Sequence, residues 1–229
     1  MGPKNNLHTV TVSLASTHLG LAVETFHRLS GMDKRSMNAI SVILHSYFGL
    51  ESAINSIGYE MFKNKESQYY IPENDRNFLL KKFIKSWNYN MQLIDKIEFI
   101  ELHNNGKISN KLKNELTELN KLRNWLAHGF SYSTTFLLEE TDAENAYKIV
   151  DYEDSENWRK SFPNCKFNSL TNLNVKDAEK VLRIVFGILI ELSKMNMYYV
   201  FSLDYYCDKP TYKIIYKETV VDELLRNPD

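Results

Sequence analysis

The residues from Leu122 to Gly129 bring together the side chains that phosphodiester chemistry requires. Arg123 carries a permanent positive charge on a planar fork of N–H donors, and His128 can gain or lose a proton near neutral pH. Asn124 can hydrogen-bond to the imidazole or to a phosphate oxygen. RNA supplies its own nucleophile, the ribose 2′-hydroxyl, so its cleavage needs only a proton acceptor, a proton donor and a cation for the developing charge. The stretch therefore predicts RNA cleavage without a metal ion.

We expect these groups on one amphipathic helix, because leucines recur three or four residues apart through this region: Leu112, Leu116, Leu119, Leu122 and Leu126. Gly129 supplies the left-handed position that commonly ends a helix. Asn124 and His128 are four residues apart and share a face, while Arg123 starts about 140° round from His128 and must reach back with its long side chain. Two or three polar groups can therefore converge near one substrate atom.

The run from Arg123 to His128 resembles the R-x-x-x-x-H motif of HEPN domains, in which a polar residue commonly follows the arginine and a glycine often follows the histidine. The resemblance implies a bundle of long helices and a metal-independent endoribonuclease that works as a homodimer, each subunit supplying one motif to a shared cleft. It implies Arg123 and His128 as the catalytic pair and Asn124 as their polar companion, with no cofactor. It also implies a role in bacterial defence or a toxin–antitoxin system.

A single histidine acts as base or acid at one instant, and two copies allow both roles, which gives a physical reason for a dimeric cleft. We expect cleavage to leave a 2′,3′-cyclic phosphate and a 5′-hydroxyl. A position at a helix C-terminus favours the protonated form of His128 and suits it as the acid, although the sequence leaves both roles open. Lys121 and Tyr132 are the expected RNA-binding residues beside the motif.

One departure from the family pattern concerns HEPN toxins that are paired with nucleotidyltransferase antitoxins. These toxins usually carry a tyrosine two residues after the motif histidine, where this chain has Phe130. Regulation by nucleotidylation is therefore not expected. Two other readings stay open: a catalytically inactive HEPN module that binds nucleotide, RNA or a partner protein, and a helical interaction protein with an accidental motif. In those readings Arg123 is an ion-pair residue and His128 a helix-terminal residue favoured by the macrodipole.

The charge of the chain is balanced overall but uneven along its length. A formal net charge of −1 over 229 residues argues against a protein whose whole surface coats nucleic acid. Between residues 107 and 123, five basic residues meet only two acidic ones, giving about +3. Residues 139–156 hold eight carboxylates against Lys148 alone. This acidic segment should point away from a phosphate backbone or meet a basic partner; a solvated face is the alternative for both charged runs, and it is favoured for the acidic one.

Other kinds of site find little support. Cys165 and Cys207 lie 42 residues apart without the spacing of a zinc knuckle or a disulfide framework, and no helical histidine pair suggests a metal. We expect no cofactor and no metal, since no phosphate-binding loop motif occurs either. The most apolar run, Ile184 to Ile190, is too short to cross a bilayer. The chain is therefore predicted to be cytoplasmic, with no membrane contact.

The hydrophobic periodicity predicts a mostly α fold: an antiparallel bundle of about five long helices, with a short β-hairpin inserted after the motif helix. We expect one HEPN-like domain over residues 1–229. Its core helices fall within about 7–129 and 174–201, the hairpin and loop insertion within about 130–173, and the tail within 202–229. The expected helices cover about 7–30, 33–63, 74–102, 110–129 and 174–201. The hairpin strands are expected at 134–138 and 147–152, a loop at 152–172 and a short strand at 212–216.

Overall fold

The computed structural model describes residues 14–29, 37–63, 73–128, 134–140, 147–154, 156–196, 199, 201–203 and 213–226. The helices within these ranges are α1 (Ala15–Leu29), α2 (Met37–Lys63), α3 (Glu73–Tyr89), α4 (Leu93–Asn104), α5 (Asn110–His128), α6 (Glu156–Ser161), α7 (Val175–Met195) and α8 (Glu218–Leu225). The strands are β1 (Thr134–Glu140), β2 (Tyr147–Asp154), β3 (Phe201–Leu203) and β4 (Lys213–Ile215). The prediction of a mostly α fold is confirmed.

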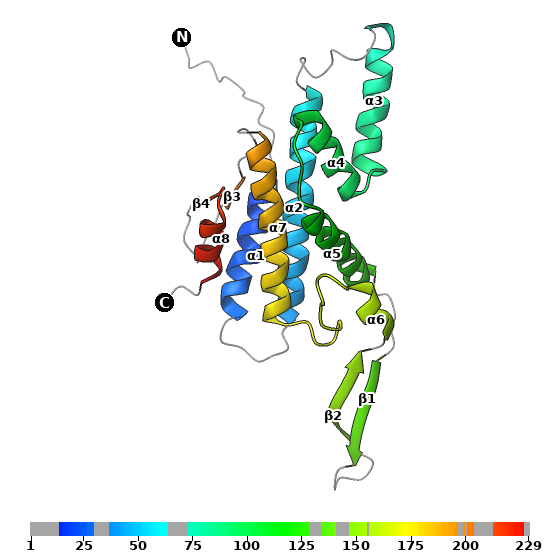
Figure 1. Cartoon of the computed structure of the whole chain (residues 1–229), viewed down its shortest axis with the longest axis vertical. Helices are drawn as coiled ribbons and strands as arrows, with labels where there is room; N and C mark the ends of the chain where they lie inside the picture. The colour runs from blue at the N-terminus through cyan, green and yellow to red at the C-terminus, as the bar shows by residue number, and fades with distance from the viewer. Residues whose placement is uncertain are drawn as a thin grey trace, which may run out of the picture.

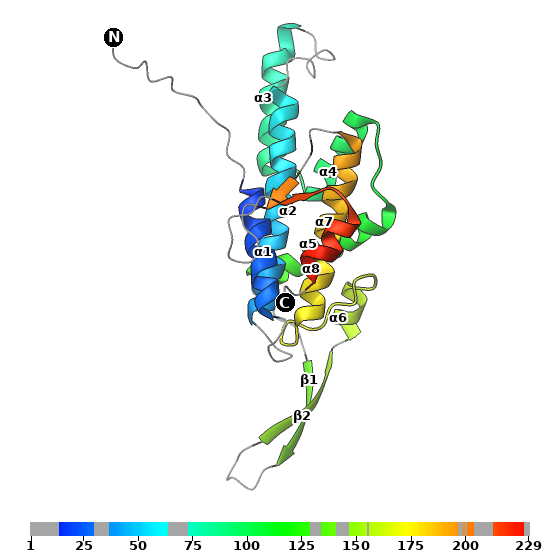
Figure 2. The same ribbon diagram turned by 90° about the vertical axis from the view of Figure 1, so that its left-hand side faces the viewer.

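Helices α1, α2 and α7 lie side by side and form the centre of the bundle (Figures 1 and 2). Helix α7 is the most deeply buried, because it contacts α1, α2, α5 and α8 and is apolar around most of its circumference. Its buried side chains include Val181, Leu182, Val185, Phe186, Ile188, Leu189 and Leu192. Among the helices of the described ranges, none combines the length and apolar character needed to cross a membrane.

The directions of the helices follow from their connections. Helix α1 runs antiparallel to α2, whereas α7 runs parallel to α2 (Figure 1). The connection between residues 129 and 174 carries the hairpin and α6, and it returns the chain to the end of the bundle where α2 begins. Helix α5 packs against α2 and α7 and runs obliquely to both (Figures 1 and 2).

The helix expected over residues 74–102 is divided in the structure into α3 and α4. The backbone N–H groups of Asn90 and Met91 both donate to the carbonyl of Ser86, which closes α3. Helix α4 begins directly afterwards, and its first turn is capped because the Asp95 carboxylate accepts a hydrogen bond from the backbone N–H of Gln92 at 3.2 Å. The apolar periodicity continues through this break, so the prediction of one long helix was wrong.

Two further expectations about helix extent were wrong. The segment expected as a loop over residues 152–172 contains α6, whose Trp158 indole donates to the carbonyl of Phe167 at 2.9 Å and packs on Phe162. The last major helix was expected to reach residue 201, but α7 ends at Met195 and residues 201–203 pair with β4 instead. The tail also forms α8, which was not anticipated. Short amphipathic segments such as α6 and α8 form helices because they are buried against the rest of the protein.

The hairpin after the motif helix is confirmed. Strand β1 pairs antiparallel with β2, with an irregularity of register between Leu137 and Leu138. The ribbon projects from the bundle at the end opposite α3 (Figures 1 and 2). Leu137 and Leu138 are both exposed. A second, smaller pair of strands, β3 and β4, lies beside α1 and α7.

Candidate functional site

Helix α5 holds the motif through its apolar face. Leu116, Leu119 and Leu122 are buried against the bundle, and this fixes the rotation of the helix about its axis. Arg123 is thereby directed toward α2, whereas His128, in the last turn, is exposed. Gly129, the expected end of the helix, lies outside the described residues.

The guanidinium group of Arg123 is held on several sides. Its Cζ atom lies 4.9 Å from the centroid of the Tyr47 ring and 6.0 Å from that of Phe48. Nη1 donates to Oδ1 of Asn124 at 2.8 Å, and Nη2 lies 3.5 Å from a carboxylate oxygen of Glu51. Nε is buried with no hydrogen-bond partner. Since 23% of the side chain stays exposed, the group is oriented but open to solvent.

The aromatic ring of Tyr47 packs against the guanidinium of Arg123. Its ring is 2% exposed, and its hydroxyl donates to Oδ1 of Asn120 on α5 at 2.7 Å. Burial raises the pKa of Tyr47 to about 12, and the Glu51 carboxylate acts in the same direction, while Arg123 opposes it. Tyr47 is therefore neutral at physiological pH and serves as a hydrogen-bonded platform.

The structure brings Arg123 and Asn124 together, but no hydrogen bond or ion pair joins either residue to His128 within the described region. The Asn124 side-chain oxygen points to the guanidinium, so its contact is with the arginine. Lys121 is exposed, and its Nζ lies 3.4 Å from the carbonyl of Ser161 at the end of α6. Tyr132, the other expected RNA-binding residue, lies outside the described residues.

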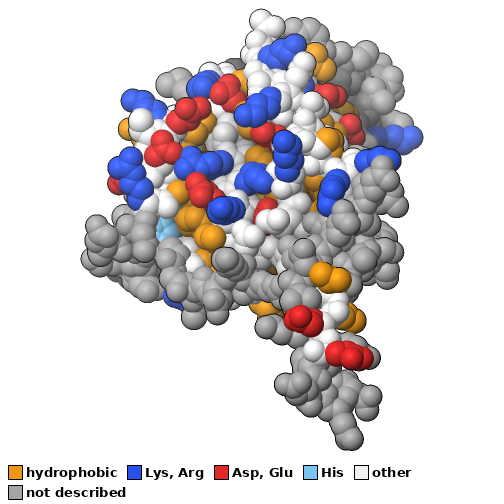
Figure 3. Space-filling model, turned by 60° about the horizontal axis from the view of Figure 1, so that its bottom comes forward, with side chains coloured by type: hydrophobic (Ala, Val, Ile, Leu, Met, Phe, Trp, Pro, Cys, Tyr) orange, Lys and Arg blue, Asp and Glu red, His pale blue; other side chains and the backbone are white. Residues whose placement is uncertain are grey.

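The basic stretch before the motif is largely paired. Lys113 contacts Glu101 at 2.5 Å, and Lys111 lies 3.8 Å from Glu115. Glu118 turns inward, where its carboxylate accepts hydrogen bonds from the backbone of Asn164 and Cys165. Figure 3 shows Lys and Arg side chains interspersed with Asp and Glu on the face that it displays. Any RNA contact on that face is therefore local.

The fold brings into contact two histidines that the sequence pattern does not connect. Nδ1 of His18 on α1 lies 3.1 Å from Nδ1 of His45 on α2, and the rings stack with centroids 5.3 Å apart. Both rings also border Phe48, at 5.9 and 6.5 Å between centroids. Because the two residues are 27 positions apart on different helices, no local spacing could have joined them.

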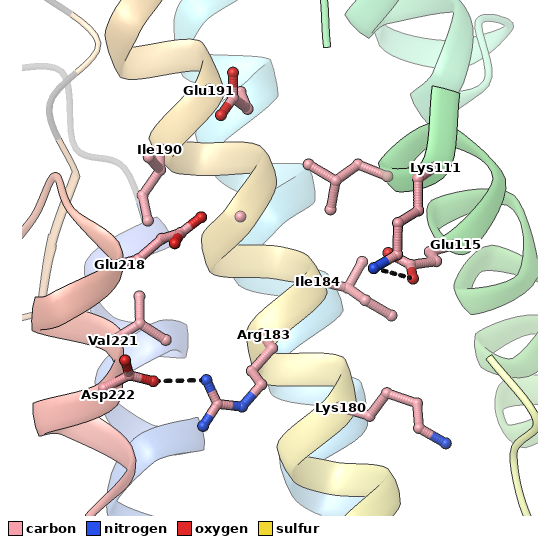
Figure 4. A pocket seen from close by; sticks show the side chains of 12 residues that line it. Lys111, Glu115, Lys180, Arg183, Ile184, Ile190, Glu191, Glu218, Val221 and Asp222 are labelled. Atoms are coloured by element: carbon pink, nitrogen blue, oxygen red, sulfur yellow. Dashed lines mark hydrogen bonds and ion pairs between the residues drawn. The ribbon is translucent and has the colours of Figure 1, made fainter. Parts of the chain in front are cut away.

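A groove of about 510 Å³ lies between α5, α7 and α8 on another part of the surface (Figure 4). Its floor is apolar, and its charged rim is paired internally, as by Arg183 with Asp222 at 2.8 Å. The described residues contain no cluster of three or more His, Cys, Asp or Glu able to hold a metal ion. Burial raises the pKa of Cys165, with Glu118 adding to the effect, so this thiol is protonated and a poor nucleophile. Neither the groove nor this thiol offers an unmatched cation or nucleophile.

Comparisons of the chain with protein-family models, with curated proteins and with solved structures found no match.

Proposed function

We propose that this protein is a metal-independent endoribonuclease of the HEPN type. The observation that carries the proposal is the setting of Arg123, whose guanidinium is oriented by two aromatic rings, Asn124 and Glu51 while remaining partly exposed. A cation fixed in this way loses little conformational freedom when it binds a phosphate. The same helix carries His128, exposed in its last turn, as a group that can exchange protons.

The proposed reaction is internal transesterification. The 2′-hydroxyl loses its proton to a neutral imidazole as the 2′-oxygen bonds to phosphorus. The bond from phosphorus to the 5′-oxygen breaks, and that oxygen takes a proton from a protonated imidazole. Arg123 stabilises the charge that develops on the phosphoryl oxygens. The products are a 2′,3′-cyclic phosphate and a 5′-hydroxyl, and no metal takes part.

The proposal includes a homodimer in which two copies of the motif form the cleft. It also includes a cytoplasmic location and a role in bacterial defence or a toxin–antitoxin system. RNA is the substrate, Lys121 and Tyr132 are its additional contacts, and a regulatory protein such as an antitoxin is a further partner. The acidic residues 139–156 are where a basic partner would bind by charge complementarity.

Total RNA incubated with the purified protein in EDTA tests the proposal. We expect cleavage by the wild type and a loss of about 100-fold or more in Arg123→Ala and in His128→Ala. Arg183→Ala and His103→Ala are matched controls, because both residues are exposed and lie on other helices. End-group analysis should find cyclic phosphate. Intact RNA, or equal cleavage by the wild type and both motif variants, would overturn the proposal.

One observation favours the inactive HEPN module as a second candidate. Arg123 already has a carboxylate partner in Glu51, as an arginine with a purely structural role would have. This candidate predicts that the wild type binds a fluorescent RNA oligonucleotide without cutting it. Fluorescence anisotropy combined with gel analysis of the same sample separates the two functions.

A further inference from the structure

The contact between His18 and His45 allows only one proton between their two facing Nδ1 atoms. Because their Nδ1 atoms are 3.1 Å apart, one Nδ1 must donate and the other must accept. Two fully protonated rings would direct two N–H groups at each other. Neither Nε2 atom hydrogen-bonds to a described residue; in a neutral pair, the ring whose Nδ1 donates keeps an unprotonated Nε2, and the ring whose Nδ1 accepts carries its proton on Nε2.

Phe48 connects this pair to the motif. The Phe48 ring lies beside both imidazoles. It also lies beside the guanidinium of Arg123, whose Cζ is 6.0 Å from the ring centroid. Helices α1, α2 and α5 thus each contribute a polar group around one half-buried aromatic ring. The surroundings are open, because Leu21, three residues after His18 on α1, is 41% exposed and Leu14, immediately before α1, is 56% exposed.

The charges near the pair favour a neutral ring. Burial lowers the pKa of His45, and the charge of His18 lowers it further. Among the described residues, Arg123 borders Phe48, and its charge is partly offset by Glu51, 3.5 Å from Nη2. A general base requires a neutral imidazole with an unprotonated Nε2, which His45 has when its Nδ1 donates to Nδ1 of a neutral His18.

We infer that His18 and His45 form the general base of a ribose-phosphate site centred on Phe48, with Arg123 binding the phosphate. This inference rests on the proposed function and adds to it a base within the same subunit. The 2′-hydroxyl proton moves to the unprotonated Nε2 of His45, whose Nδ1 donates to His18, as the 2′-oxygen bonds to phosphorus. The bond to the 5′-oxygen then breaks, and a protonated His128 from the second motif of the dimeric cleft supplies the proton to that oxygen.

The decisive variants are His18→Asn and His45→Asn. An asparagine amide occupies the position of Nδ1 and keeps a hydrogen bond to the neighbouring ring, but it does not exchange protons at neutral pH. We expect RNA cleavage at pH 7 to fall about 100-fold in His45→Asn, with unchanged melting temperature and unchanged binding of a 2′-deoxy oligonucleotide that cannot be cut. His103→Asn, on α4, is the matched control and should retain full cleavage.

A purely structural role for the pair predicts the opposite result, in which both asparagine variants cleave RNA within a factor of three of the wild type. That result, obtained with an active wild type, overturns this inference and leaves the proposed nuclease intact. A wild type that cuts no RNA overturns the nuclease proposal and the base assignment together. As a readout apart from turnover, the imidazole proton resonances of His18 and His45 should shift when the 2′-deoxy oligonucleotide is added. Unshifted resonances would place the ligand elsewhere and overturn the inference.

Discussion

At the scale of single residues, the ion pair of Arg123 with Glu51 determines what the guanidinium offers to a ligand. The carboxylate is 35% exposed and lies 3.5 Å from Nη2, so solvent screens the pair and its contribution to stability is below about 1 kcal/mol. The same carboxylate nevertheless repels a phosphate that approaches Arg123. Glu51 therefore affects RNA binding more than folding.

We predict that Glu51→Gln increases affinity for a short RNA oligonucleotide by about fivefold, equivalent to about 1 kcal/mol, because one negative charge is removed beside Arg123. Fluorescence anisotropy at low and high salt measures the effect, which should shrink as salt screens the charge. Glu191→Gln, which removes a carboxylate from an ion pair with Lys194 on α7, is the control. An unchanged or weaker affinity for Glu51→Gln would contradict the role given to Arg123.

Tyr47 gives a prediction about pH. Its pKa is about 12 in the folded protein against an ordinary value of 10, so the unfolded chain loses this proton first. The resulting stabilisation is complete below pH 10 and is lost as pH rises toward 12. We expect the difference in unfolding free energy between the wild type and Tyr47→Phe to shrink by about 1 kcal/mol from pH 9 to pH 11.

At neutral pH the same variant should lose about 1 kcal/mol of stability, because the hydrogen bond to Asn120 is gone. Urea unfolding at each pH measures both effects. Parallel pH profiles for the wild type and Tyr47→Phe would show that the buried phenol does not titrate as described.

Sequence spacing predicted the content of the motif better than its surroundings. It indicated that Arg123, Asn124 and His128 share the end of one helix, which the structure bears out. It could not indicate that Phe48 and Glu51 lie against Arg123, because these contacts depend on how α5 crosses α2. The contact between His18 and His45 cannot be predicted for the same reason, since a contact between two helices leaves no periodic pattern in either sequence.

At the scale of elements, two glycines in helices differ in the room around them. A Cβ atom at Gly58 of α2 would overlap the buried indole of Trp87 on α3. A Cβ atom at Gly187 of α7 would lie 3.2 Å from the end of the flexible Leu112 side chain, on the floor of the groove. Gly58 therefore permits close packing of α2 and α3, whereas close packing around α7 does not depend on a glycine at position 187.

We predict that Gly58→Ala lowers the unfolding free energy by about 1–3 kcal/mol, because the indole must shift within a packed aromatic cluster. Gly187→Ala should change it by less than about 1 kcal/mol, since the gain in helix propensity offsets the closer contact with Leu112. Chemical denaturation of both variants tests the pair. Equal stabilities would mean that Trp87 is free to move away from α2.

Elements were predictable where one amphipathic face is long and uninterrupted. The motif helix, the hairpin and the Asn174 cap of α7 all follow from local pattern, and the Asn174 side chain does accept from the backbone N–H of Lys176 at 2.9 Å. The break between α3 and α4 and the short helices α6 and α8 did not follow. Their ends are set by single hydrogen bonds and by burial against distant residues, which periodicity does not record.

At the scale of the whole molecule, the proposed cleft requires two chains. We predict a species of twice the 26.9 kDa chain mass by light scattering, and RNA cleavage per chain that falls when dilution converts this species to monomer. Cleavage proportional to protein concentration across that range would argue for a site complete in one subunit. The parallel direction of α7 relative to α2, like the oblique course of α5, belongs to this scale and could not be inferred from the helix pattern alone.

Helix α5 precedes the hairpin in the chain, and α6 follows it. The rings of Trp125 at the end of α5 and Trp158 on α6 are in contact, with centroids 5.1 Å apart, so the two helices are joined at the base of the hairpin. A backbone cut between β1 and β2 would leave one polypeptide with α1 to α5 and another with α6 to α8. These two pieces meet through the surfaces of α1, α2 and α5 on α7, which form the main apolar core. The protein is therefore suited to reconstitution from two separately produced fragments, and a protease nick in the hairpin would leave the bundle assembled.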